Sequence, residues 1–132
     1  MGIFCFIDSV SEVKKNESLT AFFMLKGNED FLKDHFTGFP VMPGVLQLES
    51  LKQAATRLLW ESMAEKPHYR FQTIGSVKYG QFVKPGSLLK IFIRLLKKEH
   101  QISYFEGRID LADGQQQVGR TILADFTLVG VR

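Results

Sequence analysis

One segment of the chain has the periodicity of a long helix. The segments after it alternate with the period of β-strands, and those before it have the composition of strands. Between Val45 and Pro67, apolar residues recur at helical spacing and form one stripe, made of Leu48, Leu51, Ala55, Leu58 and Leu59. Further apolar positions widen this stripe, so we expect protein to surround the helix almost completely.

Six other segments have the composition or the alternation of strands. Two precede the helix and four follow it: residues 3–10, 17–26, 71–79, 89–99, 102–111 and 118–128. Asp113-Gly114 predicts a hairpin turn before the last strand, whose alternation places on one face Val118, Arg120, Ile122, Ala124, Phe126 and Leu128. This order predicts an α+β domain whose antiparallel sheet wraps around one long central helix. No linker or repeat interrupts it, so residues 1–132 are expected to form a single domain.

Composition and charge narrow the class of protein. Apolar residues make up 45% and charged residues 23% of the chain, which is typical of a globular protein with a substantial core. The net charge is only +3 and the basic residues are scattered, which argues against nucleic-acid binding. Residues 3–7 are too few to span a bilayer and no basic leader precedes them, so we expect a cytoplasmic protein without membrane insertion. Cys5 has no partner for an intrachain disulfide and is expected in the core.

The segment before the helix brings together residue types that acid–base chemistry needs. His35 is followed by a stretch that holds Pro40 and Pro43 and cannot form regular structure. Gly44 begins the helix, and Glu49 follows about one turn inside it. A stiff connector therefore joins an imidazole, a helix N-terminus and a carboxyl group.

These groups have complementary chemical uses. A neutral imidazole at His35 can act as a general base. Apolar neighbours would favour the protonated form of Glu49 that a general acid requires, and Gln53, one turn further along, could hold one of its oxygens. The N–H groups of Gly44 and Val45 lack intrahelical acceptors and can stabilise negative charge on a substrate oxygen. Together these groups fit proton abstraction beside a carbonyl followed by loss of a leaving group.

Each feature also has a simpler explanation. A lone histidine in a turn is more often structural than catalytic, and a glutamate near a helix start often only compensates the helix dipole. Proline and glycine commonly precede a helix for backbone reasons alone. Their occurrence together at this spacing makes coincidence the weaker interpretation. His68 and His100 lie in polar segments beside turns, and we interpret both as surface residues.

The pattern His35-Phe36-x-Gly38-x-Pro40-x-x-Pro43-Gly44-Val45-Leu46-x-x-Glu49 resembles the signature of hotdog-fold 3-hydroxyacyl-[acyl-carrier-protein] dehydratases of the FabZ type. Glutamate at the helix position favours this branch over the FabA type, which carries aspartate there. The resemblance continues through residues 53–55, 77–79 and 85–86, so it covers nearly the whole chain. Asp34, Thr37 and Ser87 differ from the residues usual in the family, which suggests a specialised member.

The resemblance implies a role for each group of the motif. His35 would take the proton from the carbon next to the thioester carbonyl, and Glu49 would deliver a proton to the departing β-hydroxyl. The Gly44 N–H would polarise the thioester carbonyl, and the Val41 carbonyl would orient the His35 ring. The expected reaction converts (3R)-3-hydroxyacyl-[acyl-carrier-protein] to trans-2-enoyl-[acyl-carrier-protein] and water, in fatty-acid or related polyketide and lipid biosynthesis. No metal or redox cofactor is implied, because the substrate is carried on the phosphopantetheine of the acyl carrier protein.

The resemblance also implies an assembly and a set of substrate contacts. In the family two chains pair edge to edge, each site takes its histidine from one chain and its acid from the other, and dimers often form hexamers. We therefore expect a homodimer with shared sites, and a trimer of dimers as a further assembly. Candidates to line the acyl tunnel are Phe39, Tyr79 and Phe82. Candidates to dock the acidic carrier protein are Lys78, Lys84, Lys97 and Lys98, although ordinary surface charge explains each of them equally well.

Two alternative functions stay open. A hotdog acyl thioesterase would place an acid on the helix without needing this histidine–loop–helix spacing, and it would release free thiol without changing the β-carbon. A non-catalytic acyl-binding hotdog subunit would need neither His35 nor Glu49, and both residues are present here.

Overall fold

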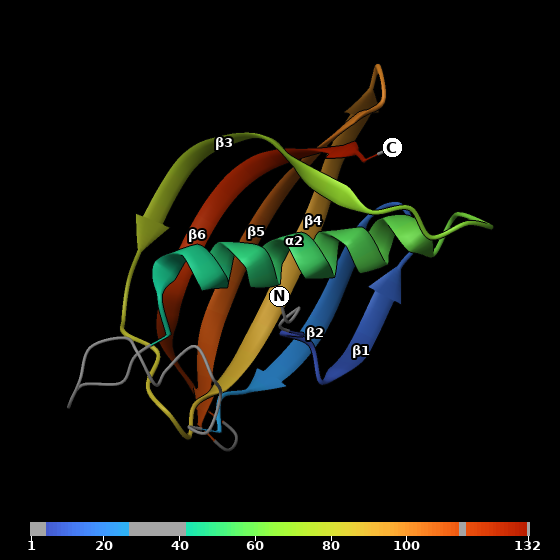
Figure 1. Ribbon diagram of the computed structural model, residues 1–132. Helices are drawn as coiled ribbons and strands as arrows, with labels where there is room; N and C mark the ends of the chain where they lie inside the picture. The colour runs from blue at the N-terminus through green and yellow to red at the C-terminus, as the bar shows by residue number, and fades with distance from the viewer. Residues whose placement is uncertain (1–4, 27–41, 114–115, 132) are drawn as a thin grey trace.

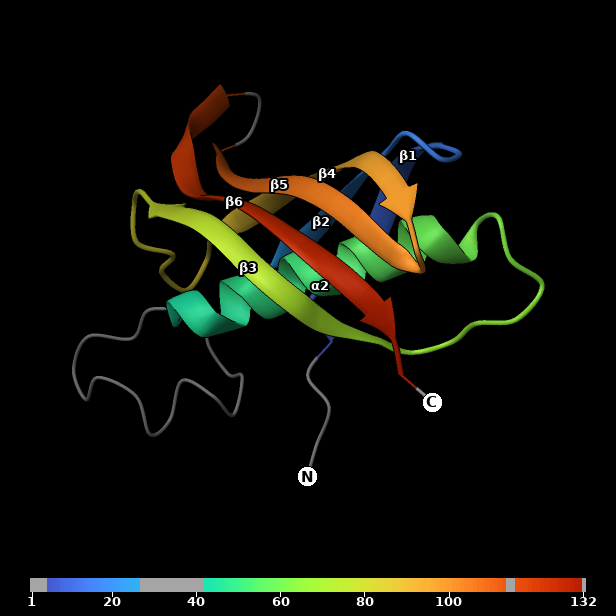
Figure 2. The same cartoon turned by 90° about the horizontal axis from the view of Figure 1, so that it is seen from above.

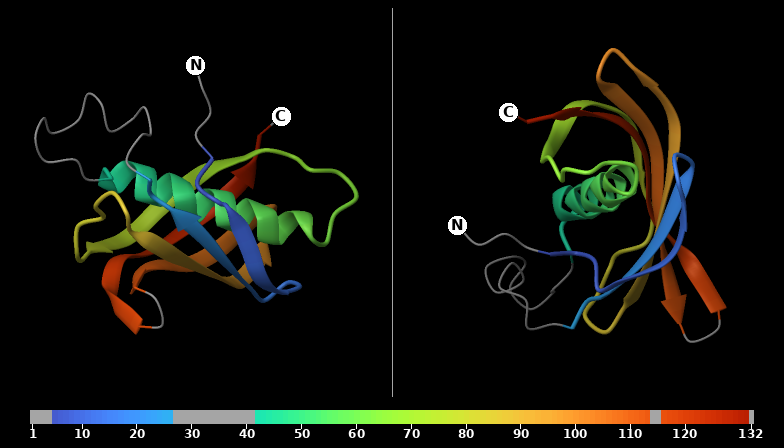
Figure 3. Two further views of the ribbon diagram at one scale, coloured as in Figure 1. Left: turned by 90° about the horizontal axis from the view of Figure 1, so that it is seen from below. Right: turned by 90° about the vertical axis from the view of Figure 1, so that its right-hand side faces the viewer.

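The computed structural model describes residues 5–26, 42–113 and 116–131. Six strands form one antiparallel sheet in the order β1-β2-β4-β5-β6-β3, and the helix α2 (Gly44–Trp60) lies across its concave face (Figure 1). The strands are β1 (Ser9–Lys14), β2 (Ser18–Met24), β3 (Tyr69–Tyr79), β4 (Leu88–Glu99), β5 (Ile102–Asp113) and β6 (Gln116–Gly130). Seen from the end of the helix, the sheet curls around one side of α2 (Figure 3). This architecture confirms the predicted α+β fold.

The buried residues of α2 form one stripe that packs on the sheet. They are Gln47, Ser50, Leu51, Ala54, Ala55, Leu58 and Leu59. Close packing beneath Leu51 depends on Gly107 of β5, because a methyl group there would lie 3.0 Å from a Leu51 methyl carbon and 2.7 Å from one of Ile93. The helix ends at Trp60, earlier than the stop expected at Pro67, and the Trp60 indole N–H donates to the Pro67 carbonyl at 2.7 Å.

The segment that contains α2 connects strands at opposite parts of the sheet. β2 pairs with β1 and β4, whereas β3 pairs with β6 and lies at the far edge of the sheet (Figure 2). Among the described strands, β1 and β3 are therefore the two edges. The last three strands, β4, β5 and β6, pair in that order as antiparallel neighbours. In the turn between β4 and β5, His100 and Gln101 have positive φ angles of 52° and 67°. Two positive φ angles are typical of a two-residue hairpin turn of type I′.

The prediction of a first strand at residues 3–10 is wrong, because the structure places β1 at Ser9–Lys14. Of the described residues before β1, Phe6 is 1% exposed and packs edge-on against Phe23. The Phe6 N–H donates to the side chain of Gln53 on α2 at 2.8 Å. Burial in the core, and not strand pairing, explains why Phe6 and Ile7 are apolar.

The predicted face of the last strand is correct except at Arg120. Ile122, Ala124, Phe126 and Leu128 are buried as expected, but Arg120 is exposed, and the Val118 side chain lies outside the description. The pairing passes from Ile109↔Ile122 directly to Asp110↔Arg120, so one extra residue, Thr121, enters the strand and reverses the alternation. The Thr121 hydroxyl is completely buried and donates to the Ile109 carbonyl at 3.3 Å.

The structure confirms the expected exposure of two histidines and corrects the expected burial of the cysteine. His68 and His100 are exposed, as predicted for surface residues. Cys5 is exposed, which corrects the expectation of a core cysteine, because the chain enters the core only at the next residue. Within the described ranges, none of the helical structure combines the length and the hydrophobicity that crossing a membrane would require.

Candidate functional site

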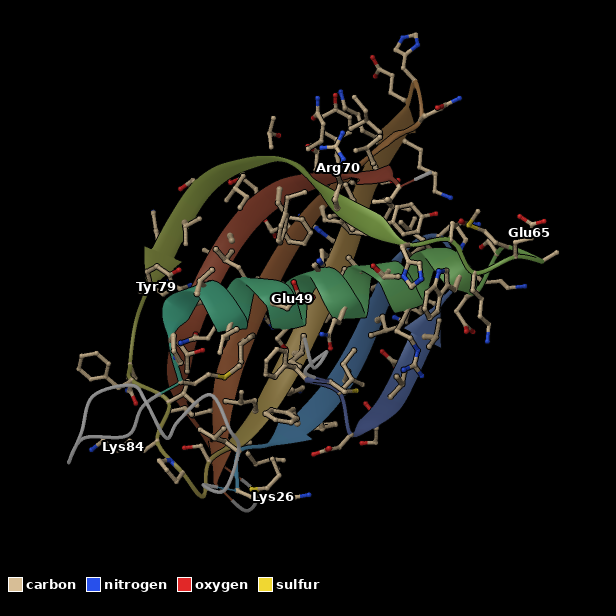
Figure 4. The ribbon with its side chains drawn as sticks, in the orientation of Figure 1. Lys26, Glu49, Glu65, Arg70, Tyr79 and Lys84 are labelled. Carbon is tan, nitrogen blue, oxygen red and sulfur yellow. The ribbon has the colours of Figure 1, made fainter. Side chains whose placement is uncertain are left out.

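Glu49 lies on the side of α2 that is turned away from the sheet (Figure 4). The apolar stripe of the helix occupies the opposite side, where the sheet covers it. As a result, 33% of the Glu49 side chain is exposed in the single chain. The sequence predicted a more desolvated carboxyl group within a nearly surrounded helix, and the difference arises because the sheet covers only one side of α2.

Each carboxyl oxygen of Glu49 has a separate partner. Gln53 donates its side-chain N–H to Oε2 at 3.3 Å, so the expected contact between these two residues is present. The ammonium group of Lys52 lies 2.8 Å from Oε1. The sequence reasoning missed Lys52, although its i,i+3 spacing from Glu49 is a signal that could have revealed the pair.

The orientation of the Gln53 amide is determined by the chain before β1. Its Oε1 accepts a hydrogen bond from the Phe6 N–H at 2.8 Å, so its amino group is the part that faces Glu49. Ser50, one helical turn earlier, also approaches this segment, with its hydroxyl 3.5 Å from the Phe6 carbonyl oxygen. The N-terminal segment thus helps to hold the acid in place through Gln53.

The N-terminus of α2 is the second feature of the site. Pro43 precedes the first helical residue with φ −60° and ψ 147°, and among the described residues no side chain caps this end by a hydrogen bond. Gly44 lies directly against Tyr79 at the end of β3, since a methyl group at Gly44 would approach the tyrosine ring to 2.6 Å. About five residues of helical rise, ~7.5 Å, separate Gly44 from Glu49 along the axis. The structure therefore brings the expected donor, the expected acid and one tunnel candidate to the same half of the helix.

Three of the predicted site residues lie outside the described residues. They are His35, Phe39 and Val41, within the undescribed segment 27–41. The roles of a base, a tunnel wall and an orienting carbonyl stay predictions for them. Phe82, the other tunnel candidate, lies in the segment after β3 and is 66% exposed, while Tyr79 is 54% exposed.

The four lysines proposed for carrier docking do not form one patch. Lys78 lies near the end of β3 and Lys84 lies in the segment before β4, whereas Lys97 and Lys98 lie at the far end of β4. A strand of 12 residues separates its two ends by about 36 Å. Lys97 is also paired with Glu99 at 3.4 Å and lies over the Tyr104 ring at 4.6 Å. Lys84 lies toward the end of the molecule that carries the start of α2 (Figure 4). The end of β3 that bears Lys78 lies there too, because Tyr79 contacts Gly44.

Metal-binding residue types do not gather in the described part of the chain. Across residues 5–26, 42–113 and 116–131, no group of three histidine, cysteine, aspartate or glutamate side chains is placed to hold a metal ion. The chemistry that the described site offers is that of a carboxyl group, its two donors and a helix N-terminus.

Comparison with known proteins agrees with this arrangement. The family model of ApeI-like proteins, described as ApeI dehydratase, matches residues 11–117. The chain is 40% identical over 103 residues to the 3-hydroxyacyl-[acyl-carrier-protein] dehydratase FabZ of Pediococcus pentosaceus, covering 76% of this chain and 68% of that protein. It is 38% identical over 111 residues to the FabZ of Rhizorhabdus wittichii, covering 81% and 70%.

Among solved structures, the dehydratase heterocomplex ApeI:P from Xenorhabdus doucetiae has a similar fold. The TM-score is 0.76 at 16% identity, and the match covers 97% of this chain and 84% of the other. At this identity the likeness shows the hotdog fold alone, with one helix packed against an antiparallel sheet.

Proposed function

The chain belongs to the ApeI-like family of dehydratases, and on that premise we propose that it removes water from (3R)-3-hydroxyacyl chains on an acyl carrier protein. The product is the trans-2-enoyl thioester. The observation that carries the proposal is the similarity to FabZ dehydratases over most of the chain. The position of Glu49 on the open side of α2, with a donor on each oxygen, supports the same chemistry.

The proposed roles follow from what each group can do. His35 takes the proton next to the thioester carbonyl, and the electrons of that C–H bond form the new double bond as the C–O bond of the hydroxyl breaks. Glu49 gives its proton to the departing oxygen, so water leaves. The helix N-terminus at Gly44 stabilises the negative charge that develops on the carbonyl oxygen, and Val41 orients the histidine ring. These steps need side chains and backbone only.

We further propose that residues 1–132 act as a single hotdog domain that pairs through β3. This strand is an edge in the described sheet, with Ile74 43% exposed, and an exposed edge strand favours pairing with another strand. Pairing two β3 strands would place two α2 helices on the same side of a continuous sheet. The histidine of one chain could then face Glu49 of the other, and the partner would also reduce the exposure of Glu49.

Incubation with 3-hydroxyacyl carrier proteins of graded chain length tests the reaction. Mass spectrometry should show loss of one water from the bound acyl group, and the same product should be missing with Glu49→Gln. Release of free thiol with an unchanged β-carbon would instead identify a thioesterase. An unchanged acyl group that stays bound to folded protein would identify an acyl-binding subunit.

Mixing two inactive variants tests whether the site is shared. Chains with His35→Ala and chains with Glu49→Ala should each be inactive alone and should regain partial activity when they are unfolded together and reassembled. This occurs because some mixed dimers combine an intact base with an intact acid. A mixture that stays inactive while size-exclusion chromatography shows dimers would refute the shared site.

Charge reversal tests the docking of the carrier protein. The acidic carrier should bind near Lys78 and Lys84, because these two lysines lie toward the N-terminal end of α2. Lys84→Glu should therefore raise KM for the acylated carrier protein several-fold at low salt, with little change in kcat. Lys98→Glu makes the same change of charge at the distant end of β4 and is the matched control. An equal rise in KM for both variants would show that net charge, and not a local surface, governs binding.

A further inference from the structure

Lys52 connects the acid on α2 with the edge strand β3. Its ammonium group lies 2.8 Å from Glu49 Oε1 and 5.8 Å from the centre of the Phe71 ring. The Phe71 ring is itself held edge-on against Phe126, with the ring centres 5.4 Å apart. Only 24% of the Lys52 side chain is exposed. Lys52 is therefore enclosed between a carboxyl group and an aromatic face, unlike a lysine that extends into solvent.

Most ion pairs at a protein surface contribute little, because water screens the charges and the side chains lose freedom. The Lys52–Glu49 pair differs in two respects. Both side chains are mostly buried, which strengthens the interaction between the charges. The charge on one partner would also change during the proposed reaction, since an acid that gives up its proton becomes negative.

We propose that Lys52 is a positioning residue for the dehydration, which rests on the proposed function. In the step that releases water, the C–O bond breaks and its electron pair goes to the oxygen. The Glu49 proton passes to that oxygen, and the carboxylate that remains lies beside the Lys52 ammonium group. Lys52 keeps its own proton throughout and stabilises the charge that forms on Glu49.

The two donors to Glu49 have different tasks. Gln53 is neutral, and its amide is oriented by the Phe6 N–H, so it fixes the plane of the carboxyl group. Lys52 supplies the positive charge at the other oxygen. Each carboxyl oxygen can accept more than one hydrogen bond, so both contacts leave sites for the transferred proton and the substrate.

Steady-state kinetics of three variants test this role. Lys52→Met keeps a long apolar side chain but removes the charge, and we expect kcat to fall about tenfold with KM unchanged within about twofold. Lys52→Arg restores a cation that can hold a carboxylate and should recover most of kcat. Lys66→Met is the matched control, because it also removes one positive charge beside an aromatic ring, that of Trp60 at 5.9 Å. A wild-type kcat for Lys52→Met, or failure of Lys52→Arg to recover activity, would overturn the proposal.

A double-mutant cycle on the free energy of unfolding separates this proposal from the proposed function. Lys52→Met and Glu49→Gln should be non-additive, because each removes the same contact between the Lys52 ammonium group and Glu49 Oε1. Additive effects would show that Lys52 does not hold Glu49, whatever the activity of the protein. A wild-type protein without dehydratase activity would refute the proposed function and the role of Lys52 in that reaction, while the cycle still decides whether the pair exists.

Discussion

Replacing glycine by alanine should cost much stability at Gly80 and little at Gly44. Gly80 directly follows β3, and its N–H donates to the Thr121 carbonyl at 2.8 Å. The next N–H, of Gln81, donates to the Arg120 carbonyl at 2.9 Å. A methyl group at Gly80 would overlap the Arg120 carbonyl oxygen, which is backbone and has no freedom to swing aside. At Gly44 the added methyl group would meet only the tip of Tyr79, which is 54% exposed.

The expected magnitudes follow from what must move in each variant. In Gly80→Ala the end of β6 must shift, which adds an overpacking cost of ~1–3 kcal/mol and weakens two hydrogen bonds that contribute ~1 kcal/mol each. We therefore expect the free energy of unfolding to fall by about 3–5 kcal/mol. In Gly44→Ala the tyrosine ring can rotate toward solvent, and alanine favours the helix by up to ~1 kcal/mol, so the net change should stay within ~1 kcal/mol.

Urea unfolding followed by circular dichroism measures both changes, provided that the m-values agree with the wild type. Gly130→Ala serves as a control, since no atom of the described residues lies within 4 Å of a methyl group at that position. Equal midpoints for Gly80→Ala and Gly44→Ala would refute the reasoning, because it depends on the difference between backbone and side-chain neighbours.

Three further predictions concern the core, the alkaline limit of stability and a turn. Leu51→Ala should lower the free energy of unfolding by ~2–5 kcal/mol, because Leu51 is completely buried between α2 and the sheet, and a loss below ~1 kcal/mol in urea unfolding would contradict this packing. Burial raises the pKa of Tyr69 above its ordinary value of 10.0. The folded state therefore holds this proton more tightly, and the resulting stability is complete below the ordinary pKa and lost as the pH rises through the raised value. Tyr69→Phe should show a smaller alkaline loss of stability than the wild type, and identical pH–stability curves would argue against the shift. Replacing His100-Gln101 by Asn-Gly should raise the free energy of unfolding by about 1 kcal/mol, because both positions have positive φ; an unchanged melting temperature would show that the turn carries no strain.

The local pattern of the sequence was sufficient for most of the secondary structure. Helical spacing between Val45 and Pro67 identified α2, since burial against one sheet requires an apolar stripe of that period. Alternation identified the four strands after the helix for the same reason. Composition identified β2 but placed the first strand too early. Phe6 is apolar because it is buried against Phe23 of β2, and composition alone does not distinguish this kind of burial from strand pairing.

The chemical motif was also visible in the sequence, but its surroundings were not. The spacing of His35, Gly44 and Glu49 depends on neighbours along the chain, and so does the contact between Gln53 and Glu49, one helical turn apart. The exposure of Glu49 depends instead on which side of α2 the sheet covers. The contact between Lys52 and the Phe71 ring of β3 likewise forms only on folding, because these residues are distant in the sequence.

Sequence by itself therefore determined the elements, their order and the residues that could carry acid–base chemistry, because these depend on local periodicity and spacing. The tertiary structure decided the strand order with β3 at an edge and the extra residue at Thr121. These features arise from contacts between segments distant in the chain, whose pairing register is selected only when all of the strands pack around the same helix.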